Sequence, residues 1–368
     1  MSAVDPGPAL GVFDRLRSRR DAVLSSPSFQ RWAARFFLTK RAARRDGERL
    51  FDLVAGFTYS QILRAVVGFE LPNRLASGPK SSGELALECG VPSASMARLC
   101  QGAAALDLLQ RCRDGRYRLA RLGAALRGVP GLQEMIRHHD ILYGDLSDPE
   151  AFFRGDALPE LAAFWPYVFG PGAERDPDQS ARYSQLMADT QTLVADETLK
   201  AVDLSGIGEL MDIGGGTGAF LRAALEHYPM LRGRLVDLPG VTAEPHARIM
   251  QSPADFRTDA LPKGADGISL IRVLYDHSDD TVTALLTKVF DVLPPKGRIL
   301  ISEPMSGGSQ PSRFGDVYFA LYCMAMRTGT VRDPAQISAL LTRAGFVSVR
   351  VARMDRPFIT QAVTAEKP

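Results

Sequence analysis

The segment RVLYDHSDD at residues 272–280 places two side chains that can handle a proton two positions apart. Imidazole has a reference pKa of about 6.5 and can act as a general base near neutral pH. The phenol of tyrosine, with a reference pKa of about 10, is a poor base but a good hydrogen-bond partner for a hydroxyl group. Tyr275 and His277 are therefore candidate catalytic residues, although a histidine in a surface loop is an equally ordinary structural feature.

A glycine-rich turn supplies a second group of candidates. The apolar stretch ELMDI leads directly into GGGTGAF, and the helical pattern LRAALEHY follows. Gly214, Gly216 and Gly218 therefore lie in a strand-to-helix turn, where glycines let the backbone approach a nucleotide closely. Gly214, Gly216 and Ala219 also satisfy the G-x-G-x-x-A variant of a dinucleotide site, so the glycines alone do not choose the cofactor.

Acidic residues near this turn favour S-adenosylmethionine. Asp212 comes just before the glycines, where a carboxylate would attract an ammonium group and repel a pyrophosphate. Asp237 ends the next strand, 21 residues after Gly216, and could accept hydrogen bonds from ribose hydroxyls, as it would in an NAD site. Asp255 and Phe256 lie near the end of a third strand and suit an adenine amino group and ring face. A helix cap is the alternative role for each aspartate.

These candidates need a scaffold to position them. From residue 209 onward, short apolar strands alternate with helices, which predicts a mostly parallel sheet with helices on both faces. The expected strands are ELMDI, GRLVDL, DGISLIRV, GRILISE, VSVRVARM and PFITQAVTA. The fold class is therefore expected to be α/β, with residues 201–368 forming the domain that binds the cofactor.

The preceding part of the chain has a different pattern. Over residues 50–130, three helical stretches precede DGRYRLARLG, which we interpret as a tight hairpin. Helix, turn, helix and a small wing is typical of winged-helix DNA-binding domains, but the second helix offers few basic side chains for reading bases. Dimerisation or capping of a substrate is at least as well supported. Residues 131–200 are helical and aromatic, and we interpret them as a connector that lines a substrate pocket.

Composition sets further bounds. The chain of 368 residues, 45% hydrophobic and 23% charged, suits a globular protein of two domains. Its four cysteines include no C-x-x-C pair, and no cluster of ligand residues has metal-site spacing, so we expect neither a metal site nor a disulfide framework. The absence of an uninterrupted apolar run of about 18 residues and of a secretory signal favours a cytoplasmic protein.

Residues 1–49 form a basic, amphipathic segment. They carry 11 Lys and Arg against five acids, whereas the rest of the chain has more acids than bases. The arginines interleave with Trp32, Phe36, Phe37 and Leu38, a pattern that can lie on an anionic membrane surface and make a peripheral contact with the inner membrane. A solvated helical face packed on its own domain is the simpler alternative. A nucleic-acid tail has weaker support, and we expect no nucleic-acid partner.

Four motifs carry a resemblance to a known family: LMDIGGGTGAF, LVDLPGV, DGISLIRVLYDHSDD and LPPKGRILISEPM. In this order they resemble the successive motifs of the small-molecule O-methyltransferases that use S-adenosylmethionine, and the resemblance extends from about Leu50 to the end. It implies a winged-helix-like N-terminal domain that pairs two subunits into a homodimer, and a Rossmann-like C-terminal domain that holds the cofactor. Arg272 joins the residues expected to bind that cofactor.

The chain departs from the family pattern at two catalytic positions. The family loop usually reads L-H-D-W-x-D, with the His as general base and two Glu residues that orient it. Aligned on its Leu and Asp residues, this loop has Tyr275 in place of the His and His277 in place of the Trp. The first Glu corresponds to Glu303, which we expect to be catalytic, but Val331 occupies the position of the second.

Further segments narrow the resemblance. SEPMSGG, DVYFALYCMAMRTG, MIRHHDILYGDLSDP and FWPYVFG, together with the altered loop, resemble the bacterial O-methyltransferases of acyclic carotenoids. That group implies methylation of the tertiary 1-hydroxyl of hydroxyneurosporene and demethylspheroidene in the spheroidene pathway of photosynthetic bacteria. A tertiary alcohol is far less acidic than a phenol, so a histidine base would not form its free alkoxide. Catalysis is then expected to depend more on positioning the acceptor, for which effective molarities reach about 10⁵ M or more.

Such an acceptor needs an apolar pocket and a group that takes the proton. We expect that group to be His277 or one of the adjacent His138 and His139, with His139 assigned as the catalytic candidate of the pair. The expected pocket residues are Phe152, Phe153, Phe164, Trp165, Tyr167, Phe314, Tyr318, Leu321 and Tyr322. Two alternatives stay open, a methyltransferase for a tetrapyrrole or an aromatic polyketide and a winged-helix regulator that binds S-adenosylmethionine without catalysis.

Overall fold

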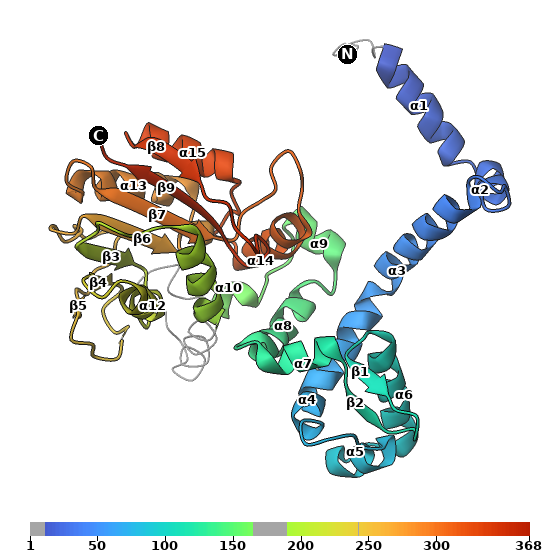
Figure 1. Ribbon diagram of the computed structural model, residues 1–368. Helices are drawn as coiled ribbons and strands as arrows, with labels where there is room; N and C mark the ends of the chain where they lie inside the picture. Colours follow the sequence, from blue (N-terminus) through green and yellow to red (C-terminus); the bar gives the residue numbers. More distant parts are fainter. Residues whose placement is uncertain (1–11, 165–189, 242) are drawn as a thin grey trace. The chain divides into compact units, whose positions relative to one another are not determined.

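The computed structural model describes residues 12–164, 190–241 and 243–368 of the chain (Figure 1). Contacts within the chain divide it into two compact units, Met1–Arg121 and Leu122–Pro368. The described helices of the expected connector belong to the second unit, because their buried side chains pack in a cluster with elements near its C-terminal end.

The first unit is helical apart from one hairpin. Its described elements are α1 (Val12–Leu24), α2 (Pro27–Ala33), α3 (Lys40–Gly68), α4 (Leu71–Arg74), α5 (Ser82–Cys89), α6 (Ser93–Ala105), β1 (Leu109–Arg111) and β2 (Tyr117–Leu119). Helix α5 begins at a capping box, in which the Ser81 and Glu84 side chains each accept a backbone N–H of the other residue. It ends at Gly90, whose φ of 64° is left-handed. These local signals explain the turn between α5 and α6.

The wing lies earlier in the chain than predicted. Strand β1 pairs antiparallel with β2, with Leu109 opposite Leu119. The segment DGRYRLARLG therefore supplies only part of the turn and the second strand, and its last residues begin helix α7 (Arg121–Gly128). The first strand was missed because three residues are too few to show the alternation of a strand.

Apolar side chains of the N-terminal helices are exposed in the single chain. Phe13, Trp32 and Phe37 are 80%, 49% and 67% exposed. These three side chains are therefore not covered by the described part of their own unit, whereas Ala33 of the same segment is buried. By length and composition α3 could also cross a membrane, but those two properties do not separate a membrane span from a helix that packs against another subunit.

The second unit is built around a sheet of seven strands. These are β3 (Glu209–Ile213), β4 (Arg232–Val236), β5 (Ile249–Gln251), β6 (Gly267–Ile271), β7 (Arg298–Glu303), β8 (Val347–Val351) and β9 (Gln361–Glu366). Its described helical elements are α7, α8 (Leu132–Asp145), α9 (Pro149–Arg154), α10 (Leu161–Phe164), a helix over residues 190–201, α12 (Ala219–His227), the 3-10 turn η2 (Leu274–Asp276), α13 (Asp279–Val292), the π-helical η3 (Arg313–Phe319), α14 (Ala320–Met326) and α15 (Pro334–Arg343).

The sheet confirms the predicted α/β architecture. Its order is β5-β4-β3-β6-β7-β9-β8, parallel from β5 to β7, with β9 antiparallel to both of its neighbours. Helices α13 and α15 lie on one face, and α12 lies on the other (Figure 1). Each face has its own apolar core, so the strands are buried on both sides, as a parallel sheet requires.

One edge of this sheet collects the predicted functional residues. Strands β4, β3, β6 and β7 are parallel neighbours, so their carboxyl ends lie along the same edge. The glycine turn follows β3, Asp237 follows β4, the loop with Tyr275 follows β6, and Glu303 ends β7. The fold therefore brings together residues that are up to 91 positions apart.

Candidate active site

The glycine turn has a backbone that other residues would not tolerate. Gly214, Gly216 and Gly218 have φ values of 70°, 57° and 77°, a region that L side chains rarely adopt. A Cβ at Gly214 would lie 2.9 Å from Cγ2 of Val273, and one at Gly215 would collide with the Asp212 carboxylate. A Cβ at Gly216 would meet nothing within 4 Å. The turn is thus packed against neighbouring side chains at Gly214 and Gly215 but has open space at Gly216. This open space fits a ligand that lies on the turn.

Asp212 is a buried carboxyl group with one unused oxygen. Ser269 Oγ donates to its Oδ1 at 2.6 Å, while its Oδ2 is buried without a hydrogen-bond partner among the described residues. Burial, the largest effect, raises the pKa of Asp212 to about 7. An unpaired buried carboxylate oxygen is costly unless a ligand satisfies it. The site therefore fits a cationic group such as the ammonium of S-adenosylmethionine.

Asp237 connects strand β4 to the glycine turn. Its Oδ2 accepts the backbone N–H of Gly216 at 2.7 Å, and its Oδ1 accepts that of Leu238 at 2.7 Å. Burial raises the pKa of Asp237, and the two N–H groups oppose that rise. Each carboxylate oxygen still has a second lone pair for a ribose hydroxyl.

The structure brings His277 together with the residues expected at the adenine ring. The His277 and Phe256 rings meet edge to face, with 5.2 Å between centroids. Burial lowers the pKa of His277 to about 4, so its imidazole is neutral at pH 7. Asp255 lies beside them, and Arg257 donates its backbone N–H and its guanidinium to that carboxylate at 2.9–3.0 Å. The pairing of Arg257 with Asp255 was not predicted from the sequence.

Two buried side chains hold the loop after β6 by hydrogen bonds to its backbone. Glu303 Oε2 accepts the backbone N–H groups of Leu274 and Tyr275 at 2.8 and 3.1 Å. Arg332, only 2% exposed, donates to the carbonyls of Leu274 and His277 at 2.8 and 3.0 Å. No motif in the sequence indicates this role for Arg332, because the two carbonyls that it binds lie 58 and 55 residues earlier in the chain.

Tyr275 and Val331 pack in one apolar cluster. Tyr275 is 5% exposed, and its ring meets Phe319 edge to face at 5.9 Å. Val331 packs against the same cluster, which also contains Cys323. The two positions at which this chain departs from the family pattern are therefore neighbours. An apolar residue at position 331 is compatible with an aromatic ring at 275, whereas a buried Glu without a His partner would be costly.

Helix α8 supplies two histidines that each meet a tyrosine. His139 Nε2 lies 2.7 Å from Tyr318 Oη, and His138 Nε2 lies 2.7 Å from Tyr322 Oη. The tyrosines stand four residues apart where the π-helical η3 continues into α14. Both histidines therefore contact the same helical segment, and the prediction that one of them serves the acceptor pocket stays a prediction.

Arg272 occupies a strained position at the end of β6. Its φ is 59°, which is unusual for a residue other than glycine and costs of order 1–3 kcal/mol. Its backbone N–H donates to Ser302 O at 2.8 Å, and its guanidinium donates to Thr190 Oγ1 at 2.9 Å. Strain of this kind concentrates at functional sites, and the position at the carboxyl edge agrees with a role near the cofactor.

The expected pocket residues have different environments. Phe152 and Tyr322 are buried, Phe314, Tyr318 and Leu321 are half-buried, and Phe153 is 60% exposed. The Phe153 ring meets the buried Phe152 ring edge to face at 5.7 Å, and its place in the pocket stays a prediction. Trp165, Tyr167 and the side chain of Phe164 lie outside the described residues.

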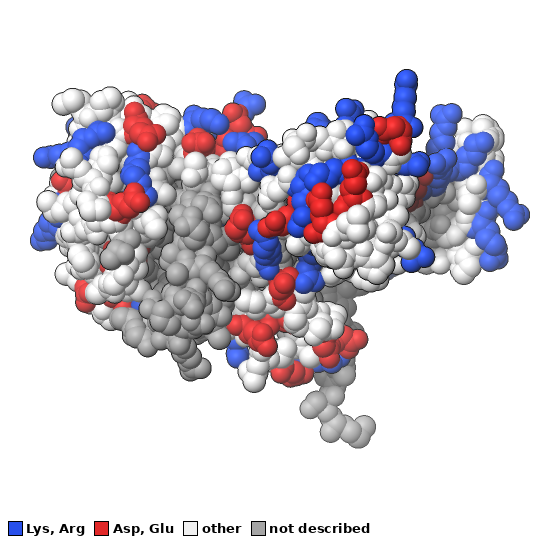
Figure 2. Space-filling view, turned by 90° about the horizontal axis from the view of Figure 1, so that it is seen from below, with Lys and Arg blue, Asp and Glu red and all other residues white. Residues whose placement is uncertain are grey.

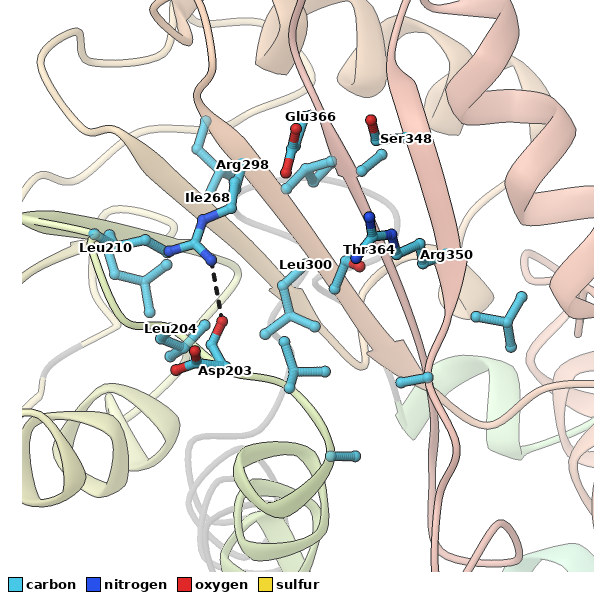
Figure 3. Close-up of a pocket in the computed structure, with 17 residues that line it drawn as sticks. Asp203, Leu204, Leu210, Ile268, Arg298, Leu300, Ser348, Arg350, Thr364 and Glu366 are labelled. Atoms are coloured by element: carbon cyan, nitrogen blue, oxygen red, sulfur yellow. Dashed lines mark hydrogen bonds between the residues drawn. The ribbon is translucent and has the colours of Figure 1, made fainter.

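A separate hollow of about 400 Å³ lies on the sheet face between residues 201–207 and strands β7, β9 and β8 (Figure 3). Figure 3 shows Arg298 reaching from β7 toward Asp203, whose carbonyl oxygen accepts its guanidinium at 3.1 Å. None of the predicted site residues lines this hollow. We therefore place the active site at the carboxyl edge.

Replacing Glu303 with glutamine tests whether its carboxyl group holds the loop. Burial raises the pKa of Glu303 from 4.5 to about 8, so the folded protein keeps a proton that the unfolded chain loses. This contribution lowers stability as pH rises from about 4.5 to about 8. Glu303→Gln should therefore be more stable than wild type at pH 8, with turnover within about threefold because the amide oxygen accepts the same two N–H groups.

The measurement is urea denaturation at pH 5 and pH 8, with Glu303→Leu as the control that leaves both N–H groups without an acceptor. The leucine variant should lose stability and turnover at both pH values. A glutamine variant with the wild-type dependence on pH would show that the Glu303 carboxyl group does not titrate as described.

Comparison with known proteins places the chain in a family. Residues 143–347 match the model of the O-methyltransferase domain, and residues 51–127 match that of the O-methyltransferase dimerisation domain. Demethylspheroidene O-methyltransferase of Cereibacter sphaeroides is 47% identical over 100% of this chain and 99% of that protein. The Rhodobacter capsulatus protein of the same name is 50% identical over 90% of this chain and 84% of that protein.

Solved structures agree on the fold. Human N-acetylserotonin methyltransferase in complex with S-adenosylmethionine has a TM-score of 0.73 at 24% identity, over 88% of this chain and 97% of that chain. The Rossmann-like domain and the helical dimerisation domain predicted from the sequence are thus confirmed. From the family matches and the two relatives, we conclude that this chain is an enzyme of the O-methyltransferase family that uses S-adenosylmethionine.

Proposed function

We propose that this enzyme methylates the tertiary 1-hydroxyl of an acyclic carotenoid, such as hydroxyneurosporene or demethylspheroidene, in spheroidene biosynthesis. The two relatives named demethylspheroidene O-methyltransferase, which match nearly the whole chain, support this substrate class. A tetrapyrrole or polyketide methyltransferase and a non-catalytic regulator are not favoured, because neither accounts for those matches.

The observation that carries the proposal is the altered loop. Tyr275 and Val331 stand where the family has its base and an orienting Glu, and they pack in one apolar cluster. A site for phenols gains from a strong base because phenols ionise readily. An unactivated alcohol gains more from being held in line with the methyl carbon. The replacement of the charged pair by apolar packing therefore suits a hydrophobic alcohol.

S-adenosylmethionine supplies an electrophilic methyl carbon, and the residues at the carboxyl edge would hold it. Asp212 Oδ2 would accept its ammonium group, and Asp237 its ribose hydroxyls. Phe256 and His277 would pack against the adenine ring, with Asp255 near the adenine amino group. In this arrangement His277 belongs to the cofactor site, and the proton of the acceptor goes elsewhere.

The test is transfer of labelled methyl to a panel of carotenoids in liposomes. We expect a methyl ether on carotenoids that carry a tertiary 1-hydroxyl and no transfer to the same carotenoids without it. A mobility-shift assay with genomic DNA should show no complex. A DNA complex without methyl transfer would instead support the regulator.

The same proposal includes a homodimer formed through the first unit. The match of residues 51–127 to a dimerisation domain supports it. So does α3, where Leu53, Val54 and Phe57 are 75%, 71% and 71% exposed along one side of the helix. A second copy would cover these side chains, which a water-exposed helix would not retain without cost.

We further propose that α1 and α2 contact the cytoplasmic face of the inner membrane, where the carotenoid substrate dissolves. Trp32 and Phe36 stack at 4.7 Å, and together with Arg31 and Arg35 they line a shallow hollow. Figure 2 shows Lys and Arg gathered at the right end of the view, with few acidic side chains beside them. Basic and aromatic side chains on one helical segment are typical of contact with anionic lipid.

Liposome flotation tests this contact with the full chain. The wild-type protein should float with anionic liposomes and not with zwitterionic ones. The variant Trp32→Ser/Phe37→Ser/Leu38→Ser should float at least about tenfold less, since each large apolar group contributes about 1.5–3 kcal/mol on burial. Equal flotation of the two proteins would contradict a membrane contact through these helices.

A further inference from the structure

We infer that Tyr318 and His139 form the proton-accepting pair of the reaction. The Tyr318 hydroxyl contacts the acceptor oxygen, and His139 receives the proton through it. The inference rests on the proposed function for one point only, that the acceptor is an alcohol that must lose its proton as it gains a methyl group.

Tyr318 lies close to the position from which the family base is missing. Its ring meets Phe319 edge to face at 4.9 Å, and Phe319 meets Tyr275 in the same way at 5.9 Å. Val331 packs against the same cluster. One aromatic side chain therefore separates the Tyr318 ring from that of Tyr275.

Tyr318 is also within electrostatic reach of the cofactor edge. Burial raises the pKa of Tyr318, and the positive charge of Arg272 opposes that rise. Arg272 ends β6, and the next residue, Val273, packs against the glycine turn at Gly214. Tyr318 is thus in contact with His139 of α8 and under the influence of a charge at the strand end beside the glycine turn.

The neighbouring pair has the same geometry but a different environment. His138 and Tyr322 also approach to 2.7 Å, yet Tyr322 is 6% exposed and packs in a cluster with Leu142 and Phe152. Burial lowers the pKa of His138 to about 4. Tyr318, in contrast, is half-buried, and its hydroxyl also lies 3.6 Å from Met135 Sδ. The pair of His138 and Tyr322 therefore belongs to the core and serves as a matched control.

The proton balance requires both members of the pair. As the acceptor oxygen bonds to the methyl carbon, the carbon–sulfur bond breaks and its electrons stay on sulfur. The hydroxyl proton of the acceptor passes to Tyr318 Oη, and the tyrosine's own proton passes to His139 Nε2. The tyrosine stays neutral throughout, which suits its raised pKa, and the imidazole ends protonated. General-base assistance of this kind contributes about 10²-fold or more.

The experiment compares four variants of the full-length enzyme with wild type: Tyr318→Phe, His139→Gln, Tyr322→Phe and His138→Gln. Steady-state transfer of labelled methyl gives kcat and KM for the acceptor, calorimetry gives the Kd of S-adenosylmethionine, and thermal denaturation gives Tm. We expect Tyr318→Phe and His139→Gln to lower kcat about 10²-fold, with the Kd within about threefold of wild type. The two control variants should keep kcat within about threefold.

The double variant Tyr318→Phe/His139→Gln separates a shared proton route from two structural defects. Its kcat should match that of either single variant, because the second substitution removes nothing further from a broken route. Unchanged kcat in both single variants, or an equal loss in all four together with lower Tm, would overturn the inference. If wild type methylates a phenol and no carotenoid, the proposed function fails, and the same variants still test the pair on that phenol.

Discussion

Replacing Arg332 with methionine should destabilise the enzyme by about 3–5 kcal/mol and abolish turnover. The guanidinium is buried and bonds to the carbonyls of Leu274 and His277. Methionine fills similar space but removes both of these bonds, at about 1.5–3 kcal/mol for each bond to a charged group. The Leu274 carbonyl keeps the backbone N–H of His277 at 3.1 Å, whereas the His277 carbonyl loses its guanidinium donor. The loop that carries Tyr275 would then lose one of its two anchors.

Urea denaturation and amide hydrogen exchange at Leu274 and Tyr275 measure this effect. The matched control is Asp279→Asn, which removes the charge that pairs with Arg332. Because the Asp279 side chain is 78% exposed, that pair should contribute about 1 kcal/mol or less. Wild-type stability and exchange in Arg332→Met would show that the loop is held by other contacts.

Replacing Asp237 with alanine should raise the Kd of S-adenosylmethionine by about 10³-fold. Two ribose hydroxyls would each lose a bond to an ionised group, at about 2 kcal/mol each. The backbone N–H of Gly216 would also lose the acceptor that now lies at 2.7 Å, which releases the glycine turn. Tm without cofactor should also fall, because the backbone N–H groups of Gly216 and Leu238 lose their acceptor. The effect on cofactor binding is therefore measured well below the Tm of the variant.

Calorimetric titration with S-adenosylmethionine provides the measurement. Glu226→Ala, which removes an exposed acid of helix α12, controls for the loss of one negative charge. A Kd for Asp237→Ala within a few-fold of wild type would remove Asp237 from the cofactor site.

The strands and the glycine turn could be predicted because their signals are local. ELMDI and GRILISE are short apolar runs, and the residues that follow β3 are glycines, which adopt backbone conformations that other residues avoid. Each of these signals is visible within a few neighbouring residues. The hairpin was misplaced for the same reason, since LQR is too short to carry a pattern. The π-helical η3 is likewise invisible in the regular spacing of Tyr318 and Tyr322.

The contacts that shape the site are not local and could not be predicted. Arg332 lies 58 residues beyond the Leu274 carbonyl that it binds, and His139 lies 179 residues before Tyr318. The position of His277 in the sequence predicts that it lies in the catalytic loop. The contact between its ring and that of Phe256 is visible only in the folded structure. The exposure of Trp32 and Phe37 depends on which other parts of the unit pack against them. The spacing of apolar residues along the chain does not contain that information.

The central claim is that the altered loop serves an unactivated carotenoid alcohol. The most direct measurement is the ratio of kcat/KM for a 1-hydroxy acyclic carotenoid to kcat/KM for a simple phenol, with the same enzyme and with the product identified by mass spectrometry. We predict a ratio of at least about 10², equivalent to about 2.7 kcal/mol of selective transition-state binding. A ratio near or below one, with the phenol methylated as readily as the carotenoid, would contradict the claim.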